Sequence, residues 1–308
     1  PRPAPSRGAP STPADTPPRS EASARADAPA RVEGAPRDGA GRGARRLRAW
    51  VPVLPAALVV AFALLGPLVI GRSPTAQVGG PFQGPSAGHP LGTDVIGRDV
   101  LARLAHGGLP VVALAAGSTL LTSGVGVVVG MATALSQRRT AELVMRVIDL
   151  VAVIPGLLLL LVLATGYPGS DLAVLVAVAL VSAPFSVRVI RAAAAQVAAA
   201  GFVEIARARG DSRRRILRHD LAPNIVRPAL AETGLRFSVA LHLTATAGFL
   251  GLGRAAPAPH WGRMVDENAA GIGLTVWPFL APVFLLLLLA VSVNLLADRL
   301  ASRLAGGL

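Results

Sequence analysis

The 308-residue chain contains no cysteine and no lysine, and aromatic residues make up only 4% of it. Without cysteine, neither a disulfide framework nor a thiolate metal site can form. Without lysine, the chain cannot hold a P-loop lysine, a Schiff-base lysine or a lysine general base. All 30 basic residues are therefore arginines, and the formal net charge is +13.

Charge of either sign is also scarce, because charged residues make up 15% of the chain and hydrophobic residues 52%. An average soluble domain has about 25% charged residues. A helix needs about 20 apolar residues to cross a bilayer, and six stretches meet or approach that length: 50–71, 109–135, 147–166, 172–190, 232–252 and 274–296. The sequence therefore predicts an all-α polytopic membrane protein with six transmembrane helices.

The first 46 residues have a different composition. Val32 is their only branched or large apolar side chain, and prolines, alanines and arginines make up most of the rest. Burial of so little apolar surface cannot offset the conformational entropy that the chain would lose on folding. We therefore expect a disordered tail over 1–48. The remaining units are expected to be a first transmembrane helix (49–72), an extracytoplasmic loop (73–107), a five-helix core (108–300) and a C-terminal tail (301–308).

Arginines are unevenly shared between the connections of the six expected spans. The connections on one side hold most of them, whereas those on the other hold Arg72, Arg98, Arg103, Arg254 and Arg263. Arginine-rich short loops stay on the cytoplasmic side. Both termini and the connection between spans four and five are therefore expected in the cytoplasm.

That connection, residues 201–224, is densely charged and has six arginines between Arg207 and Arg218. The alanine-rich stretch 192–208 favours a helix, and Gly210 favours a sharp turn after it. Asp211 or Ser212 can cap a second short helix, which Pro223 would end. Composition leaves two interpretations open, docking of a protein partner or contact with anionic lipid headgroups.

Two groups of polar residues outside this segment are candidate sites. His89, Asp94, Arg98 and Asp99 could form a metal or catalytic cluster. We favour charge pairing and a cap, by Asp99 or Thr93, for the helix that starts at Val100. In span five, Arg236, His242, Thr244 and Thr246 either line a translocation path or pack against a partner subunit. Gly126 and Gly130 have the spacing of a close helix contact, and Pro155 and Pro184 are expected to kink their helices.

Several motifs resemble those of permease subunits in ABC-type importers. Glu204-Ile205-Ala206, Gly210 and Pro223 are similar to the EAA loop, which forms a coupling helix that inserts into a groove on the ATPase subunit. The run from His89 to Arg103 resembles the outer-loop signature HPLGTDxxGRDxLxR of the dipeptide, oligopeptide and nickel branch. Two further runs, starting at Met145 and Phe249, also resemble motifs of that branch, so the likeness spans 89 to about 300.

Three positions depart from the family pattern. Ile205 replaces the first alanine of the EAA motif, Ala222 replaces the usual leucine before the proline, and Thr244 stands where a glutamate is frequent. The first two departures bear on docking geometry.

The resemblance implies a permease subunit that forms half of a translocation pathway in the cell membrane. Its implied partners are a homologous second permease, two ATP-binding subunits that carry ATP and Mg, an extracytoplasmic substrate-binding protein and membrane lipid, but no nucleic acid. It implies no catalytic residue, metal site or cofactor in this chain. The docking residues that it implies are Glu204, Ala206, Arg207, Gly210, Asp211, Ser212 and Arg215.

Two other classes remain as alternatives. A secondary transporter or channel is expected to show inverted repeats and several buried charges, whereas Asp149 is the one acidic residue that we place inside a span. A membrane-anchored regulator would use the basic segment to bind lipid or nucleic acid.

Overall fold

The computed structural model describes residues 53–305, so the tail predicted for 1–48 lies outside the described residues. The described part is built from helices and has no named strand, only isolated bridges between Gln77 and Arg98 and between Thr93 and Asp99. Its longer helices are α2 (Val53–Val69), α3 (Val100–Ala134), α4 (Arg138–Val153), α5 (Gly156–Gly166), α6 (Asp171–Ala198), α9 (Ala222–Phe249) and α11 (Trp277–Ala305). The short ones are α7 (Gly201–Ala208), α8 (Arg213–Arg215), the π-helix η1 (Ile216–Leu221), α10 (Trp261–Asn268) and the 3-10 helix η2 (Ala269–Gly271).

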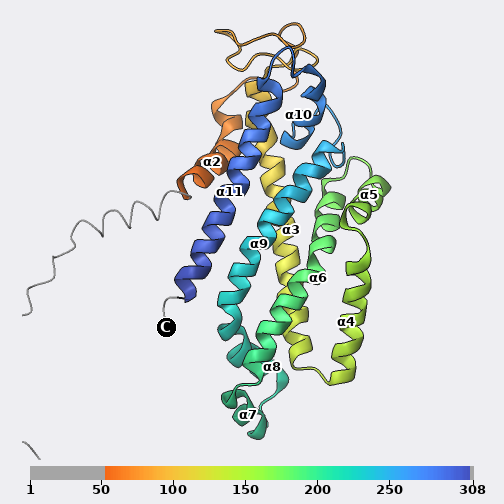
Figure 1. Ribbon diagram of the computed structural model, residues 1–308, viewed down its shortest axis with the longest axis vertical. Helices are drawn as coiled ribbons and strands as arrows, with labels where there is room; N and C mark the ends of the chain where they lie inside the picture. The colour runs from red at the N-terminus through yellow and green to blue at the C-terminus, as the bar shows by residue number, and fades with distance from the viewer. Residues whose placement is uncertain (1–52, 306–308) are drawn as a thin grey trace, which may run out of the picture. The chain divides into compact units, whose positions relative to one another are not determined.

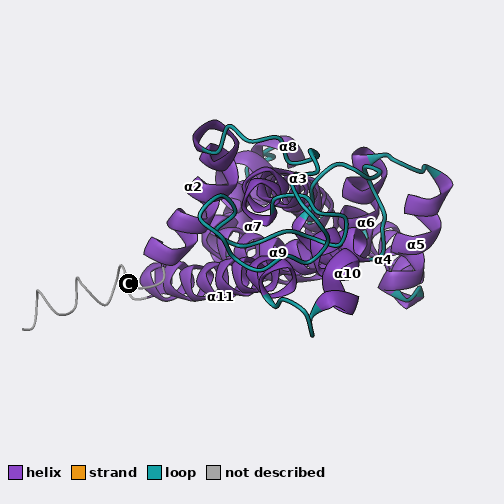
Figure 2. Cartoon of the chain, turned by 90° about the horizontal axis from the view of Figure 1, so that it is seen from above, coloured by secondary structure: helices purple, strands orange, loops and turns teal. Residues whose placement is uncertain are grey.

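Helix α3 lies at the centre, with α6 and α9 beside it (Figure 1). Helices α4 and α5 lie on one side of this group and α2 and α11 on the other, as Figure 2 also shows. The α3–α6 contact is close because Gly126 and Gly130 face Ser186 and Ile190, where a Cβ atom on either glycine would clash. This confirms the close helix contact predicted from the glycine spacing.

Three helices of the described part are long and apolar enough to cross a membrane: α3, α6 and α11 over Trp277–Leu296. Helices α4 and α5 together make a fourth candidate, but they are bent by 83° at the break that holds Ile154 and Pro155. The apolar part of α2, Ala57–Val69, is shorter, and α9 is not among the candidates. Length and composition thus support three or four of the six predicted spans. Pro155 lies at the bend, where the sequence predicted a kink, but the helix is interrupted there and not only kinked.

The connection between α6 and α9 differs from the prediction at two points. The helix expected over 192–208 is interrupted between Ala198 and Gly201, where α6 ends and α7 begins. Pro223 does not end a helix but lies in the first turn of α9, where a missing N–H costs little. The wider π-helical turn η1 comes directly before it, so the helical backbone continues from α8 through η1 into α9 without a break.

Two hydrophobic clusters hold these helices together. The larger one joins α2, α3, α5, α6, α9, α10 and α11 around buried residues such as Leu160, Leu241 and Trp261. The smaller one joins the ends of α3 and α6 to α7, η1 and the start of α9 through Ile190, Val203 and Ile216. The two clusters anchor segments at opposite ends of the helices (Figure 1). The larger cluster holds α10 and the loop between α2 and α3, named the outer loop from here on after the side expected for it, and the smaller cluster holds α7 and η1.

Candidate functional site

The segment 201–224, called the basic hairpin from here on, contains a sharp reversal at Gly210. Its φ of +81° is the left-handed conformation that glycine adopts without strain. Two hydrogen bonds close the end of α7, from Gly210 N to Arg207 O and from Asp211 N to Ala206 O, each 3.0 Å long. The Ser212 hydroxyl then caps α8 by accepting from Arg215 N at 3.4 Å. The structure thus confirms the predicted turn and the capping role of Ser212.

The basic hairpin packs against the helix bundle through an apolar inner face. Val203 and Ala206 of α7 are both fully buried, and they pack in the smaller cluster with Ile216 and Leu221 of η1. Ala206 is one of the seven predicted docking residues, but its side chain points into the bundle. It therefore supports α7 from inside, within the cluster that also includes residues at the ends of α3 and α6.

The outer face of the basic hairpin carries both charge and apolar surface. Exposed there are Glu204, Arg207, Gly210, Ser212 and Arg215. The mostly buried Asp211 side chain pairs with Arg209 at 3.2 Å and with Arg215 at 3.6 Å. These three residues, with His219 and Asp220, line a polar hollow of about 460 Å³.

Two large apolar side chains on the same outer face are exposed, Phe202 by 47% and Ile205 by 59%. Sequence reasoning noted Ile205 only as a departure from the EAA motif, and it missed Phe202. The available signal was the spacing, because Phe202 and Ile205 are three residues apart and share a helix face. Val203 and Ala206 repeat that spacing one residue later and occupy the buried face.

The four residues predicted for the translocation path do not share one site. His242 and Thr246 lie one turn apart on α9 and line an apolar groove of about 380 Å³ between α9, α10 and α11. The Thr246 hydroxyl donates to His242 O at 2.9 Å, and His242 Nδ1 lies 2.7 Å from Ser238 O. Thr244 is fully buried and faces a small cavity with Asp171 and His260 instead.

Arg236, the fourth of these residues, pairs with a carboxylate that sequence reasoning had overlooked. Its Nε lies 2.7 Å from Glu232 Oε1, and the Glu232 side chain is only 4% exposed. The contact is electrostatic and not a well-aligned hydrogen bond, since neither atom has a hydrogen-bond partner. Asp149 is therefore not the one acidic residue within a predicted span, because Glu232 is the first residue of the span predicted over 232–252 and lies inside α9. The four-residue spacing of Glu232 and Arg236 was the signal that could have revealed the pair.

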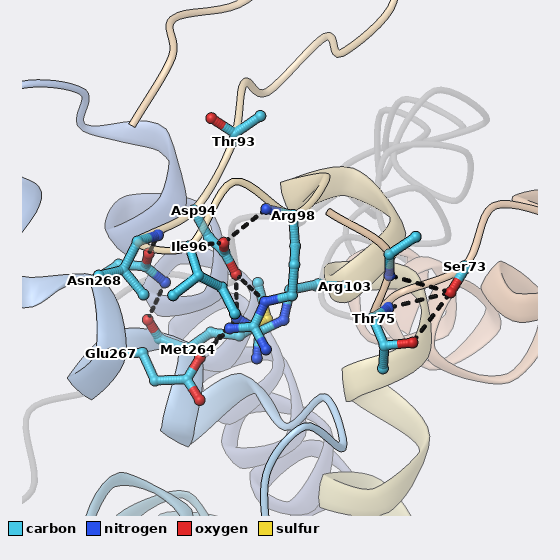
Figure 3. A network of polar contacts seen from close by, with 12 residues as sticks. Ser73, Thr75, Thr93, Asp94, Ile96, Arg98, Arg103, Met264, Glu267 and Asn268 are labelled. Atoms are coloured by element: carbon cyan, nitrogen blue, oxygen red, sulfur yellow. Dashed lines mark hydrogen bonds and ion pairs between the residues drawn. The ribbon is translucent and has the colours of Figure 1, made fainter. Parts of the chain in front are cut away.

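The outer loop forms a buried cluster of charges with α3 and α10 (Figure 3). Asp94 Oδ2 accepts from Arg98 Nε at 2.6 Å and from Arg103 Nη1 at 2.5 Å. Glu267 Oε2 of α10 accepts from the same two arginines, at 2.9 and 2.6 Å. Two carboxylates balance two guanidinium groups, so the cluster is neutral and joins residues far apart in the sequence. This confirms the charge pairing predicted for Asp94 and Arg98.

Asp99 is the N-cap of α3, as the sequence predicted. Its Oδ1 accepts from the N–H groups of Leu101 and Ala102, at 2.9 and 3.3 Å. Its Oδ2 contacts His89 Nδ1 at 3.0 Å and Arg72 Nη1 at 2.8 Å.

These contacts determine the ionisation of the cap. Burial alone would raise the pKa of the Asp99 carboxyl, but the hydrogen bonds from His89, Arg72 and the two backbone N–H groups outweigh it, so the pKa is lowered. The cap is therefore held as a carboxylate, the form that accepts these hydrogen bonds.

A second contact between α10 and α3 involves His260 and Trp261. The Trp261 indole donates to Leu104 O at 2.8 Å, and a Cβ atom on Gly108 would clash with the indole ring. Burial lowers the pKa of His260 to about 4, with a further contribution from the positive charge of Arg263. A neutral His260 can accept the hydrogen bond from Gly262 N at 3.2 Å that caps α10.

Comparison with known proteins gives matches that agree with one another. The family described as "Binding-protein-dependent transport system inner membrane component" matches residues 126–306. The dipeptide transport system permease protein DppC of Alkalihalophilus pseudofirmus is 31% identical over 225 residues, 72% of this chain and 73% of the relative. The di/tripeptide transport system permease protein DppC of Pseudomonas aeruginosa is 31% identical over 254 residues, 80% of this chain and 84% of the relative.

A third relative is the probable D,D-dipeptide transport system permease protein DdpC of Escherichia coli K12. It is 33% identical over 234 residues, which are 72% of this chain and 76% of the relative. Among solved structures, the MetNI methionine ABC transporter in inward-facing conformations superposes with a TM-score of 0.56 at 19% identity. The match covers 65% of this chain and 95% of that chain, so it shows a common fold.

Proposed function

Because the chain belongs to the family of binding-protein-dependent transport system inner membrane components, we propose that it forms one half of the membrane pathway of an ATP-driven importer of short peptides. It is a permease subunit in the inner membrane and has no ATPase site of its own. Short peptides are proposed as cargo because the relatives described above are named for dipeptide or di- and tripeptide transport.

The basic hairpin is the proposed docking element for the ATPase subunits, which bind and hydrolyse ATP with Mg. The observation that carries this proposal is its two-sided structure: an inner face buried on α3 and α6, and an outer face that exposes Phe202, Ile205 and several charges. Exposed apolar side chains within a charged rim are typical of protein interfaces. Contact with lipid headgroups alone would require the arginines but not the apolar pair.

In the proposed arrangement six helical segments cross the membrane, with the basic hairpin in the cytoplasm and the outer loop on the opposite side. Helices α2 and α9 and the bent α4–α5 pair join the three clear spans, α3, α6 and α11. The polar surface of α9 suits a protein-lined path better than lipid, because ionisable groups are costly in hydrocarbon. His242 and Thr246, on the groove beside α10 and α11, are the residues proposed to line that path.

Transport requires further subunits in this proposal. A second, homologous permease completes the pathway, two ATPase subunits dock on the cytoplasmic side, and a binding protein delivers cargo from outside. Closure of the ATPases on ATP moves the basic hairpin as a rigid body, because Val203, Ala206 and Ile216 fasten it to the bundle. The attached helices α6 and α9 then change their tilt, and the pathway opens to the other side.

A charge reversal on the outer face of the basic hairpin tests the docking role. Glu204→Lys alters an exposed side chain of α7 and leaves the buried face intact. We expect the assembled transporter to lose cargo uptake by about tenfold or more, because one mismatched charge at an interface costs over 1 kcal/mol. Uptake and ATP hydrolysis are measured in vesicles containing the whole transporter.

The matched control is Glu142→Lys, which reverses another partly exposed carboxylate, on α4 and outside the basic hairpin. This variant should retain uptake. Equal uptake by the Glu204 variant and the wild type, with the ATPase subunits still bound, would contradict the docking role.

A further inference from the structure

Three helices carry charged residues at one level of the bundle. Asp149 lies eleven residues from the start of α4, Arg188 ten residues before the end of α6, and Glu232 ten residues after the start of α9. These three helix ends lie at the same end of the structure as the basic hairpin (Figure 1). At 1.5 Å per residue, each charge is about 15 Å along its helix from that end.

The charges are connected through the ring of Phe185 on α6. The Arg188 guanidinium donates to Asp149 Oδ1 at 2.6 Å and lies 5.9 Å from the centre of the Phe185 ring. The Arg236 guanidinium of α9 lies 5.9 Å from the same ring and pairs with Glu232. Two guanidinium groups, two carboxylates and one aromatic ring thus form a neutral bridge from α4 across α6 to α9. Cations over an aromatic face are attracted by its quadrupole.

Helix α4 is only partly buried against the bundle. Ala141 is its one buried residue, and a sharp bend separates it from α5. Its apolar side chains Leu143, Val147 and Leu150 are all more than half exposed. The ion pair of Asp149 with Arg188 adds a directed polar contact to the partly buried apolar side chains that join α4 to the bundle.

Helices α6 and α9, in contrast, are attached directly to the basic hairpin. The smaller hydrophobic cluster includes Ile190 of α6 and Ile225 of α9 together with Val203 of α7. A movement of the hairpin displaces both helices, and it reaches α4 through the short connection that follows α3 and through side-chain contacts such as the bridge.

We propose that Arg188 is a positioning residue for transport: it makes α4 follow α6 and α9 when the basic hairpin moves. This inference rests on the proposed importer function, and it assigns a role to charges outside both the docking face and the groove beside His242. Loss of the bridge would let the ATPase subunits move α6 and α9 without moving α4. Such a transporter would hydrolyse ATP but import less cargo for each ATP hydrolysed than the wild type does.

The test uses the complete transporter in vesicles and the variant Arg188→Gln. We expect ATP hydrolysis to continue while cargo uptake per ATP hydrolysed falls by about fivefold or more, the scale of typical coupling between sites. Arg188→Lys should restore coupling only in part, because an ammonium keeps the charge but lacks the planar group that stacks on Phe185. The matched control is Arg138→Gln, which removes an arginine that is 92% exposed and paired within α4.

A direct measurement of the movement separates this role from a purely stabilising one. Because the chain has no cysteine, spin labels can be attached at Val147→Cys on α4 and Val239→Cys on α9, both exposed positions. In the otherwise unaltered transporter the distance distribution between the labels should show a limited set of values in each nucleotide state. Arg188→Gln should broaden it in both states.

Asp149→Asn removes the same ion pair from the α4 side, so it provides the comparison if the Arg188 variant does not assemble. An unchanged distance distribution and an unchanged uptake-to-hydrolysis ratio in an intact complex would overturn the proposal. Failure of the wild-type chain to assemble with ATPase subunits would instead overturn the importer function on which it rests.

Discussion

At the scale of single residues, Asp94 shows that the outer-loop motif has a structural role. Its carboxylate is fully buried and receives Arg98 and Arg103 on one oxygen, while the other accepts the N–H groups of Ile96 and Arg98. The motif thus folds its own loop through Ile96 and Arg98 and joins it to α3 through Arg103. Glu267 then extends the cluster to α10.

We expect Asp94→Asn to destabilise the protein by about 3–5 kcal/mol, the usual cost of removing one partner of a buried ion pair. The amide would leave the two buried guanidinium groups with Glu267 as their one remaining carboxylate in the cluster. The measurement is the midpoint of thermal unfolding of the purified protein. Asp266→Asn, at an exposed position on α10, is the control and should change little. Equal midpoints for both variants would show that the cluster contributes no net stability.

At the scale of elements, the contact between α3 and α6 depends on glycine. A Cβ atom on Gly130 would come within 2.9 Å of Ile190 Cβ and Arg191 N, closer than side chains approach in proteins. Gly124, also within α3, faces open space, with nothing within 4 Å. The two positions differ in packing and not in backbone conformation, so they form a matched pair.

Gly130→Ala should destabilise the protein by about 1–3 kcal/mol, because α3 and α6 must separate to accept the methyl group. Gly124→Ala should be neutral or stabilising by up to about 1 kcal/mol, since alanine favours helix. Thermal unfolding of both variants side by side provides the comparison. A Gly130 variant as stable as the Gly124 variant would mean that the helices adjust without cost.

Prolines show how far an element can be foreseen from its sequence. A kink was predicted at both Pro155 and Pro184. Pro155 lies at the break between α4 and α5, whereas Pro184 lies inside α6, which continues through it. Pro223 begins α9 instead of ending α8. The ring removes one donor and restricts φ wherever it occurs. Whether a helix stops or continues depends on the packing of the residues on either side.

At the scale of the whole molecule, the proposed orientation puts the basic hairpin and the outer loop on opposite sides of the membrane. Two single-cysteine variants test it, because the natural chain has none. Arg213→Cys lies in the basic hairpin and Ala87→Cys in the outer loop, and both positions are exposed.

In intact cells, a membrane-impermeant maleimide should label Ala87→Cys and leave Arg213→Cys unlabelled until the membrane is opened. The reason is that short arginine-rich segments are retained in the cytoplasm. Labelled protein is quantified by mass shift. Labelling of both positions from outside, or the reverse pattern, would contradict the proposed orientation.

Short-range features could be predicted well from the sequence. The helical class follows from long apolar runs, and the turn at Gly210, the cap by Ser212 and the cap by Asp99 follow from interactions within a few residues. Each depends on the conformational preference or hydrogen-bonding capacity of one side chain near its own backbone, so the local sequence is sufficient.

The tertiary structure alone decided which residues face one another. It buried Ala206, separated Thr244 from His242 and Thr246, and brought Asp149 and Arg236 to two neighbouring side chains of α6, Arg188 and Phe185. Burial and pairing depend on helices that are distant in sequence. The local sequence around a polar residue on a helix does not distinguish a side chain that faces a partner from one that faces a groove. The sequence by itself therefore determined the class of protein and the local form of its hairpin, and helix packing decided which side chains are available to act.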